Sequence, residues 1–243
     1  VDPLTFIESD WGLDMVLFPV QRVILKAFYG MALDDNPYGL DLNEPVPEDH
    51  PQYREITTLT SLADPSYGYY KHRIVVTDHK RENRRVFSEA EYLRYLYDDK
   101  RSNIREVIPG NPLQEMVLCL GRRSGKTLLS AAISAYETYK LLRKGNPQKY
   151  YGLAEGTEIN IISIATALNQ AKELFKKTTV YFQNCNYFSP YAANITQTRY
   201  QLQTPHDIST SCRFSDDEAN AKKSLIITAM PCSGSAGRGR SAL

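Results

Sequence analysis

Two segments of the first hundred residues place apolar side chains at helical spacing. In residues 15–29 apolar positions recur every three or four residues, and Pro19 suits the first turn, so a helix is predicted there. A second helix is predicted at residues 88–102, where Ser88 and, three positions later, Glu91 form the pattern of a capping box. In both helices this spacing places the apolar side chains on one face, which can pack against a hydrophobic core.

The segment between these helices has a less regular pattern. Residues 30–70 are rich in Asp, Pro, Gly and Tyr and predict loops, with one short extended stretch at 54–58. Residues 72–77 and 85–87 flank a polar turn, which predicts a β-hairpin.

The second half of the chain has the pattern of an α/β protein. Short apolar runs predict strands at 116–120, 158–165 and 224–230. Longer amphipathic segments predict helices at 127–144 and 167–184, with Thr166 as the cap of the second. A strand, a helix and a further strand form a βαβ unit, so a parallel sheet is expected.

A polar loop that contains Gly-Lys-Thr joins the first of these strands to the first of these helices. Such a loop directs backbone N–H groups at phosphate oxygens, and the helix N-terminus adds partial positive charge. Lys126 would contact the β- and γ-phosphates of a nucleotide, and Thr127 would coordinate Mg²⁺. The predicted nucleotide-binding residues of the loop are Gly121, Arg122, Arg123, Ser124, Gly125, Lys126 and Thr127.

The loop departs from the usual GxxxxGK[ST] pattern. That pattern would place glycine at position 120, where this chain has Leu120, and the glycine follows one place later. Arg122 lies inside the loop, where a guanidinium could neutralise charge on the γ-phosphate during phosphoryl transfer. For Arg123 a phosphate contact and a solvent-facing position stay equally open.

Charge is unevenly distributed along the chain. Residues 1–110 carry 13 Lys and Arg against 19 Asp and Glu, a net of −6, and residues 111–243 carry 16 against 9, a net of +7. The basic half contains the phosphate loop, which fits either a polyanion-binding face or a solvated basic surface.

The composition gives little indication of a zinc site, a membrane-spanning helix or a signal peptide. The four cysteines have no CxxC spacing and the four histidines no ligand spacing, so they indicate reduced thiols and no zinc site. No apolar stretch approaches the ~18 residues of a membrane helix. The first residues do not have the pattern of a signal peptide.

The loop sequence LGRRSGKT resembles the deviant Walker A motif of tailed-phage large terminase subunits, the motors that package viral DNA. Three other segments resemble motifs of the same family. Residues 18–22 are similar to its adenine-reading Q motif, residues 161–166 with Gln170, Ala171 and Phe175 to its next strand–helix unit, and residues 237–241 to the Arg-Gly stretch before its Walker B strand.

This resemblance implies an ASCE or RecA-like P-loop NTPase with a mostly parallel sheet flanked by helices. It implies that ATP hydrolysis drives double-stranded viral DNA into a procapsid, with ATP and Mg²⁺ as cofactors. Lys126 and Arg122 would be catalytic, and Gln21 would hydrogen-bond to the adenine. Arg238 and Arg240 are candidates to act on the nucleotide of a neighbouring subunit.

The same resemblance implies partners and a domain plan. The partners would be double-stranded DNA, the portal protein, the small terminase subunit and further copies of the chain in a ring, with no membrane. The location would be the host cytoplasm, outside the mature virion. The expected organisation is an N-terminal helix with the Q motif at 1–30, an insertion or accessory segment at 31–110 and the ATPase core at 111–243.

Both ends of the chain look cut, so the core is expected to be incomplete at its C-terminus. The Walker B aspartate, the water-activating glutamate and an RNase H-like nuclease domain would follow Leu243. The complete protein would then hydrolyse ATP and cleave DNA, whereas the fragment would be inactive. Asp216, Asp217 and Glu218 follow no apolar strand and are interpreted as a turn.

Two other functions remain open from the sequence. A helicase-like DNA or RNA translocase shares the Q motif, the P-loop and the parallel sheet, although the arginine in the loop argues against it. A nucleotide-binding DNA scaffold without turnover is the second alternative.

Overall fold

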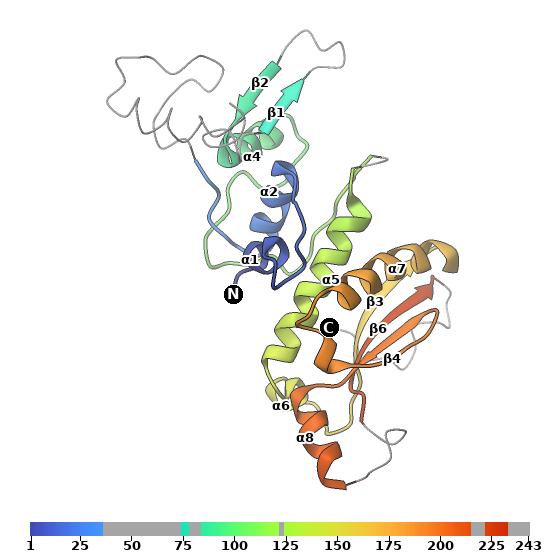
Figure 1. The fold of residues 1–243 in the computed structure, drawn as a ribbon. Coiled ribbons are helices and arrows are strands. Elements are labelled where there is room, and N and C mark those ends of the chain that lie inside the picture. Colours follow the sequence, from blue (N-terminus) through green and yellow to red (C-terminus); the bar gives the residue numbers. More distant parts are fainter. Residues whose placement is uncertain (36–73, 78–83, 122–123, 215–221, 233–243) are drawn as a thin grey trace. The chain divides into compact units, whose positions relative to one another are not determined.

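The chain forms two compact units, drawn in Figure 1. The first comprises Val1–Met15 and Cys119–Leu243, and the second Val16–Leu118. The computed structural model describes residues 1–35, 74–77, 84–121, 124–214 and 222–232. The stretch predicted to be extended at 54–58 lies outside these residues.

The first unit is built on a mixed four-stranded sheet. Its strands lie in the order β3 (Ile159–Ala165), β6 (Leu225–Pro231), β5 (Arg199–Leu202) and β4 (Ala192–Ile195). The strands predicted at 158–165 and 224–230 are confirmed, and they pair in parallel. The expectation of a mostly parallel sheet is wrong, because β4 and β5 form a short hairpin and β5 pairs antiparallel with β6.

The helices in the C-terminal part of this unit confirm the predictions at 127–144 and 167–184. They are α5 (Lys126–Arg143), α6 (Pro147–Tyr150), α7 (Leu168–Asn184), the 3₁₀ turn η1 (Ser189–Tyr191) and α8 (Pro205–Phe214). Helix α7 packs on β3 and β6 and also contacts α5. The predicted cap at Thr166 is wrong: Ala167 is the N-cap of α7, and the Thr166 hydroxyl donates to Gln170 Oε1 instead.

The strand predicted at 116–120 is absent. These residues have no regular secondary structure, and Val117 is 82% exposed. A short apolar run becomes a strand only when a neighbouring strand satisfies its backbone groups and covers its side chains. No strand of the described residues pairs with this run, so the expected βαβ unit around α5 is not formed.

A cluster of aromatic rings joins the N-terminal helix α1 (Pro3–Glu8) to α5. The ring of Phe6 is fully buried and stacks on Tyr139 with centroids 4.4 Å apart, and Trp11 meets the same phenylalanine at 5.8 Å. The hydroxyl of Tyr136 donates to the carbonyl oxygen of Val1 at 3.0 Å. Burial raises the pKa of Tyr136 to about 12. Residues 1–8 are therefore an integral part of the first unit.

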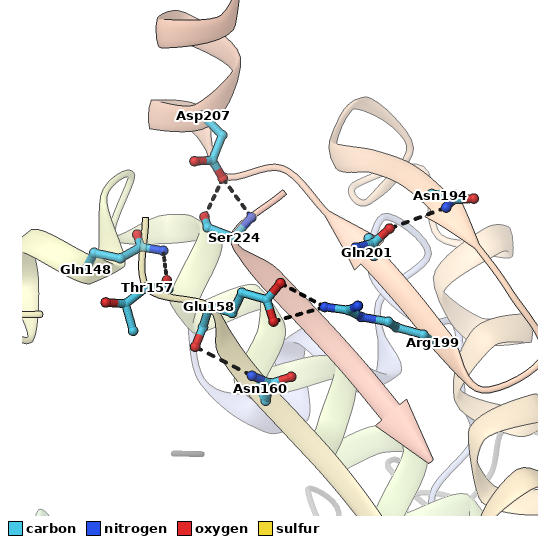
Figure 2. Close-up of polar contacts among 9 residues, drawn as sticks. All are labelled: Gln148, Thr157, Glu158, Asn160, Asn194, Arg199, Gln201, Asp207 and Ser224. Carbon is cyan, nitrogen blue, oxygen red and sulfur yellow. Dashed lines mark hydrogen bonds and ion pairs between the residues drawn. The ribbon is translucent and has the colours of Figure 1, made fainter. Parts of the chain in front are cut away.

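Two groups of polar contacts connect other elements to the residues just before β3 and β6, as Figure 2 shows. The buried carboxylate of Asp207 on α8 accepts from the backbone N–H of Thr204 and from both the N–H and the hydroxyl of Ser224, which precedes β6. The guanidinium of Arg199 donates to both oxygens of Glu158, at 2.8 and 2.9 Å. These contacts fix α8 and β5 against the beginnings of β3 and β6.

The second unit combines a helix pair with a hairpin. Its elements are α2 (Pro19–Phe28), β1 (Ile74–Thr77), β2 (Arg84–Phe87) and α4 (Glu89–Asp98). The two helices, the hairpin and the capping box of Ser88 and Glu91 are all confirmed, although both helices are shorter than predicted. The core consists of Val23, Ile74 and Tyr92 with surrounding apolar residues.

One buried ion pair links the two helices of the second unit. The ammonium of Lys26 on α2 contacts the carboxylate of Glu89, a fully buried side chain at the start of α4. The same carboxylate accepts from the backbone N–H of Asp34 at 2.9 Å. Lys26 also lies 3.1 Å from a carboxylate oxygen of Asp34, and Glu89 lies 3.9 Å from the guanidinium of Arg22, so the pair belongs to a small charge network.

Candidate nucleotide-binding site

The predicted phosphate loop leads directly into α5. Gly125 is the N-cap of this helix and has φ = 75°, a left-handed conformation in which glycine carries no steric penalty. The helix then starts at Lys126, and its first backbone hydrogen bond runs from Leu129 N–H to the Gly125 carbonyl at 2.9 Å. The buried side chains of Leu129 and Ala132 anchor this first part of the helix in the core.

The side chain of Lys126 folds back over the loop. Its Nζ donates to the carbonyl oxygen of Gly121 at 3.0 Å and to that of Leu120 at 3.3 Å. The hydroxyl of Ser124 donates to the same Gly121 carbonyl at 2.8 Å. The structure thus brings together Gly121, Ser124, Gly125 and Lys126, four of the residues predicted for the loop.

This arrangement leaves a positive charge available to an anion. Lys126 is exposed, and no carboxylate of the described residues pairs with it. Its present acceptors are neutral carbonyls, so a phosphate would offer stronger, charge-assisted hydrogen bonds. A Cβ placed on Gly121 would meet no atom within 4 Å, which indicates open space beside the loop.

Thr127, the predicted magnesium ligand, is the second residue of α5 and is exposed. A hydroxyl at that position suits a hard cation that takes oxygen ligands. Among the described residues, no group of three His, Cys, Asp or Glu side chains gathers to hold a metal ion. Thr127 is the predicted metal ligand that the described residues provide.

Gln21, the predicted adenine contact, belongs to the second unit and is 4% exposed. Its Oε1 accepts from the Phe18 backbone N–H at 3.0 Å, so the side chain caps the N-terminus of α2. Its Nε2 is buried and has no hydrogen-bond partner among the described residues. A buried amide donor without a partner is costly, and it would be satisfied by an acceptor such as a ring nitrogen.

The four predicted arginines lie outside the described residues. They are Arg122 and Arg123 in the loop and Arg238 and Arg240 near the end of the chain. The sequence did not indicate a role for the Leu120 carbonyl, which accepts from Lys126. The unusual feature of the sequence at this position is Leu120 in place of the first glycine of the motif. This feature could not predict the contact, because the contact is made by the backbone carbonyl and not by the leucine side chain.

No described helix is both long enough and apolar enough to cross a bilayer.

Comparison with protein families gives one match. Residues 71–219 match the family described as uncharacterized protein MJ0330, N-terminal P-loop domain. The match covers 149 of the 243 residues, which is more than half of the chain, and it includes the loop, α5, β3 and α7. Neither the comparison with curated proteins nor the comparison with solved structures found a match.

Proposed function

We propose a function from one premise: this chain belongs to the family described as uncharacterized protein MJ0330, N-terminal P-loop domain. P-loop domains bind nucleoside triphosphates and commonly hydrolyse them. We infer that the chain binds ATP with Mg²⁺ and is the ATPase motor module of a large terminase, which moves double-stranded DNA into a viral procapsid. The motor assignment is supported by the segments at 18–22, 120–127, 161–166 and 237–241 that resemble terminase motifs.

The geometry at the start of α5 is the observation that carries the nucleotide-binding proposal. A left-handed Gly125 turns the chain into the helix, and an exposed Lys126 lies over the loop with its charge unpaired among the described residues. The free N–H groups of the first helical turn and the positive end of the helix dipole add to this charge. These features together favour a polyphosphate at the loop.

In the proposed reaction each loop residue has a separate task. Lys126 would leave the carbonyls of Leu120 and Gly121 and hold the β- and γ-phosphates, while Thr127 would bind Mg²⁺. Arg122 would meet the charge that spreads over the γ-phosphate oxygens in the transition state. Bound Mg²⁺ would neutralise phosphate charge.

Further proposed contacts involve the adenine base and a neighbouring subunit. The unpaired Nε2 of Gln21 supports a contact with an acceptor on the base. Arg238 or Arg240 would reach the nucleotide of the next copy in a ring. The portal protein and the small terminase subunit are the proposed partners, and the host cytoplasm is the proposed location.

The affinity of the Lys126→Ala variant for ATP tests the proposal that the loop binds nucleotide. We expect the variant to bind ATP at least tenfold more weakly, because hydrogen bonds to a charged group contribute about 1.5–3 kcal/mol. The affinity would be measured by isothermal titration calorimetry. The matched control is Lys176→Ala, which removes an exposed lysine of α7. Equal affinity of both variants and the unaltered chain would refute the phosphate-loop assignment.

ATP turnover in the presence of DNA separates the motor from the alternatives, and it would be measured on a protein that includes the expected Walker B aspartate and water-activating glutamate. A duplex-translocating motor should hydrolyse ATP faster when duplex DNA is added, whereas a helicase-like enzyme should respond more to single strands. A nucleotide-binding scaffold should bind both ligands without turnover.

A further inference from the structure

The end of α5 opposite the phosphate loop carries a concentration of positive charge. Residues 138–154 contain Lys140, Arg143, Lys144 and Lys149 and no Asp or Glu. Lys140 forms an ion pair with Glu137 at 2.8 Å, one turn back on α5. The other three cations are exposed, and no carboxylate of the described residues pairs with them.

Two exposed tyrosines lie beside these cations. Tyr150 is 61% exposed and Tyr151 46% exposed, and their rings meet edge to face with centroids 4.9 Å apart. The ammonium of Lys144 lies 3.7 Å from the centre of the Tyr150 ring. We define the α5–α6 surface as Arg143, Lys144, Lys149, Tyr150 and Tyr151.

The backbone under this surface is held in place from several sides. The buried side chain of Gln148 donates to the Thr157 carbonyl at 3.1 Å, which fastens α6 to the segment before β3 (Figure 2). Asn146 caps α6 by accepting from the Lys149 N–H at 3.0 Å. The Gly145 carbonyl accepts from the backbone N–H of His206 on α8. A partner that binds here would therefore pay little for ordering the backbone.

Structural roles account for only part of this surface. Cations in the last turn of a helix interact favourably with the helix dipole, which explains Arg143 and Lys144. The dipole of α5 does not explain Lys149 on the separate helix α6, nor the exposure of two adjacent tyrosines. Cations without a carboxylate partner next to exposed tyrosines suit a polymer whose backbone combines phosphates with sugars.

We propose that the α5–α6 surface binds the sugar–phosphate backbone of DNA. The three cations contact phosphate oxygens, while the tyrosines donate their hydroxyls to phosphates and pack their rings against sugars. The choice of DNA as the polymer rests on the proposed function. Helix α5 has 18 residues and spans about 27 Å, so this surface and the phosphate loop are separate sites at the two ends of one helix.

The salt dependence of DNA binding tests this assignment. The chain and the variant Arg143→Gln/Lys144→Gln/Lys149→Gln would be titrated with a short duplex at several salt concentrations, with fluorescence anisotropy as the readout. Each lost phosphate contact lowers the slope of log K against log salt by about 0.9, so the variant should lose about 2.7. The control Lys172→Gln/Lys176→Gln/Lys177→Gln makes the same charge change on α7 and should keep the slope.

The outcomes separate this inference from the proposed function. A slope lost in the α7 control and kept in the α5–α6 variant would place the DNA contact elsewhere and overturn the inference. Failure of the unaltered chain to bind duplex would also overturn it, while the calorimetric effect of Lys126→Ala would still support nucleotide binding. Tighter binding to vesicles of anionic lipid than to duplex, with the same dependence on the three cations, would identify a membrane partner and reject DNA. Unchanged ATP affinity in the α5–α6 variant confirms that the first unit is folded.

Discussion

Two glycines with nearly the same backbone conformation stand at the two ends of α5. Gly125 has φ = 75° at the N-cap, and Gly145 has φ = 72° just after the last turn. Alanine at either position would adopt a left-handed conformation at a cost of roughly 1–2 kcal/mol. A Cβ on Gly145 would meet no atom within 4 Å, so backbone strain is the main cost there.

Substitution of Gly125 and Gly145 should separate the effect of backbone strain on stability from the effect of the loop on nucleotide binding. We expect both Gly125→Ala and Gly145→Ala to lower the free energy of unfolding in urea, and only Gly125→Ala to weaken ATP binding. The reason is that Gly125 shapes the loop that Lys126 covers, while Gly145 lies at the far end of the helix. Equal loss of ATP affinity in both variants would mean that the loop responds only to the stability of α5.

Gln21 caps α2, and substitutions can separate this role from its proposed contact with adenine. Gln21→Ala removes both the acceptor for the Phe18 N–H and the unpaired Nε2 donor. Gln21→Glu keeps an acceptor for the cap and removes the donor. If Nε2 contacts the base, both variants should lower the preference for ATP over GTP by about tenfold, and only Gln21→Ala should lose the cap.

The measurements for Gln21 are competition binding with the two nucleotides and thermal unfolding. An unchanged preference in both variants would reduce Gln21 to a capping residue of α2.

The contact between α1 and α5 makes the first unit sensitive to alkaline pH. Burial raises the pKa of Tyr136 from 10.0 to about 12, so the fold favours the neutral phenol. This stabilisation is complete below pH 10 and is lost as pH rises toward about 12, because the unfolded chain ionises first. Tyr136→Phe should therefore flatten the fall of the urea midpoint over this range. Burial also raises the pKa of Tyr187, so a smaller slope remains.

The control for this prediction is Tyr151→Phe, which changes an exposed tyrosine. A pH dependence that is the same in Tyr136→Phe and in the unaltered chain would show that Tyr136 does not contribute.

Some helix ends were predictable because their signals are local. The Ser88–Glu91 capping box and the glycine after α5 mark helix ends within a few residues, and the structure confirms both elements. The run at 116–120 has the composition of a strand but lacks a partner strand, which no local pattern reveals. Helix α8 was missed although Thr204 and Asp207 have capping-box spacing, and α1 although Asp2 and Pro3 begin it.

The division into two units limited what the sequence could say about the site. The Gly-Lys-Thr segment predicted the loop and the helix after it, since both arise from consecutive residues. Gln21 lies in the other unit, and a motif match carries no information on distance between units. The family match from residue 71 to residue 219 runs through both units, so the hairpin β1–β2 and α4 lie within the matched P-loop domain.

The packing of Trp11 has a spectroscopic consequence. The chain contains one tryptophan, and it lies in the first unit against Phe6 and Tyr139. Its indole emission depends on the local solvent, so its wavelength reports whether the α1–α5 cluster is intact. Tyrosines occur in both units, and their emission carries a signal from each. Selective excitation of the indole therefore gives an optical record of the phosphate-loop unit alone, without a label and without altering a side chain.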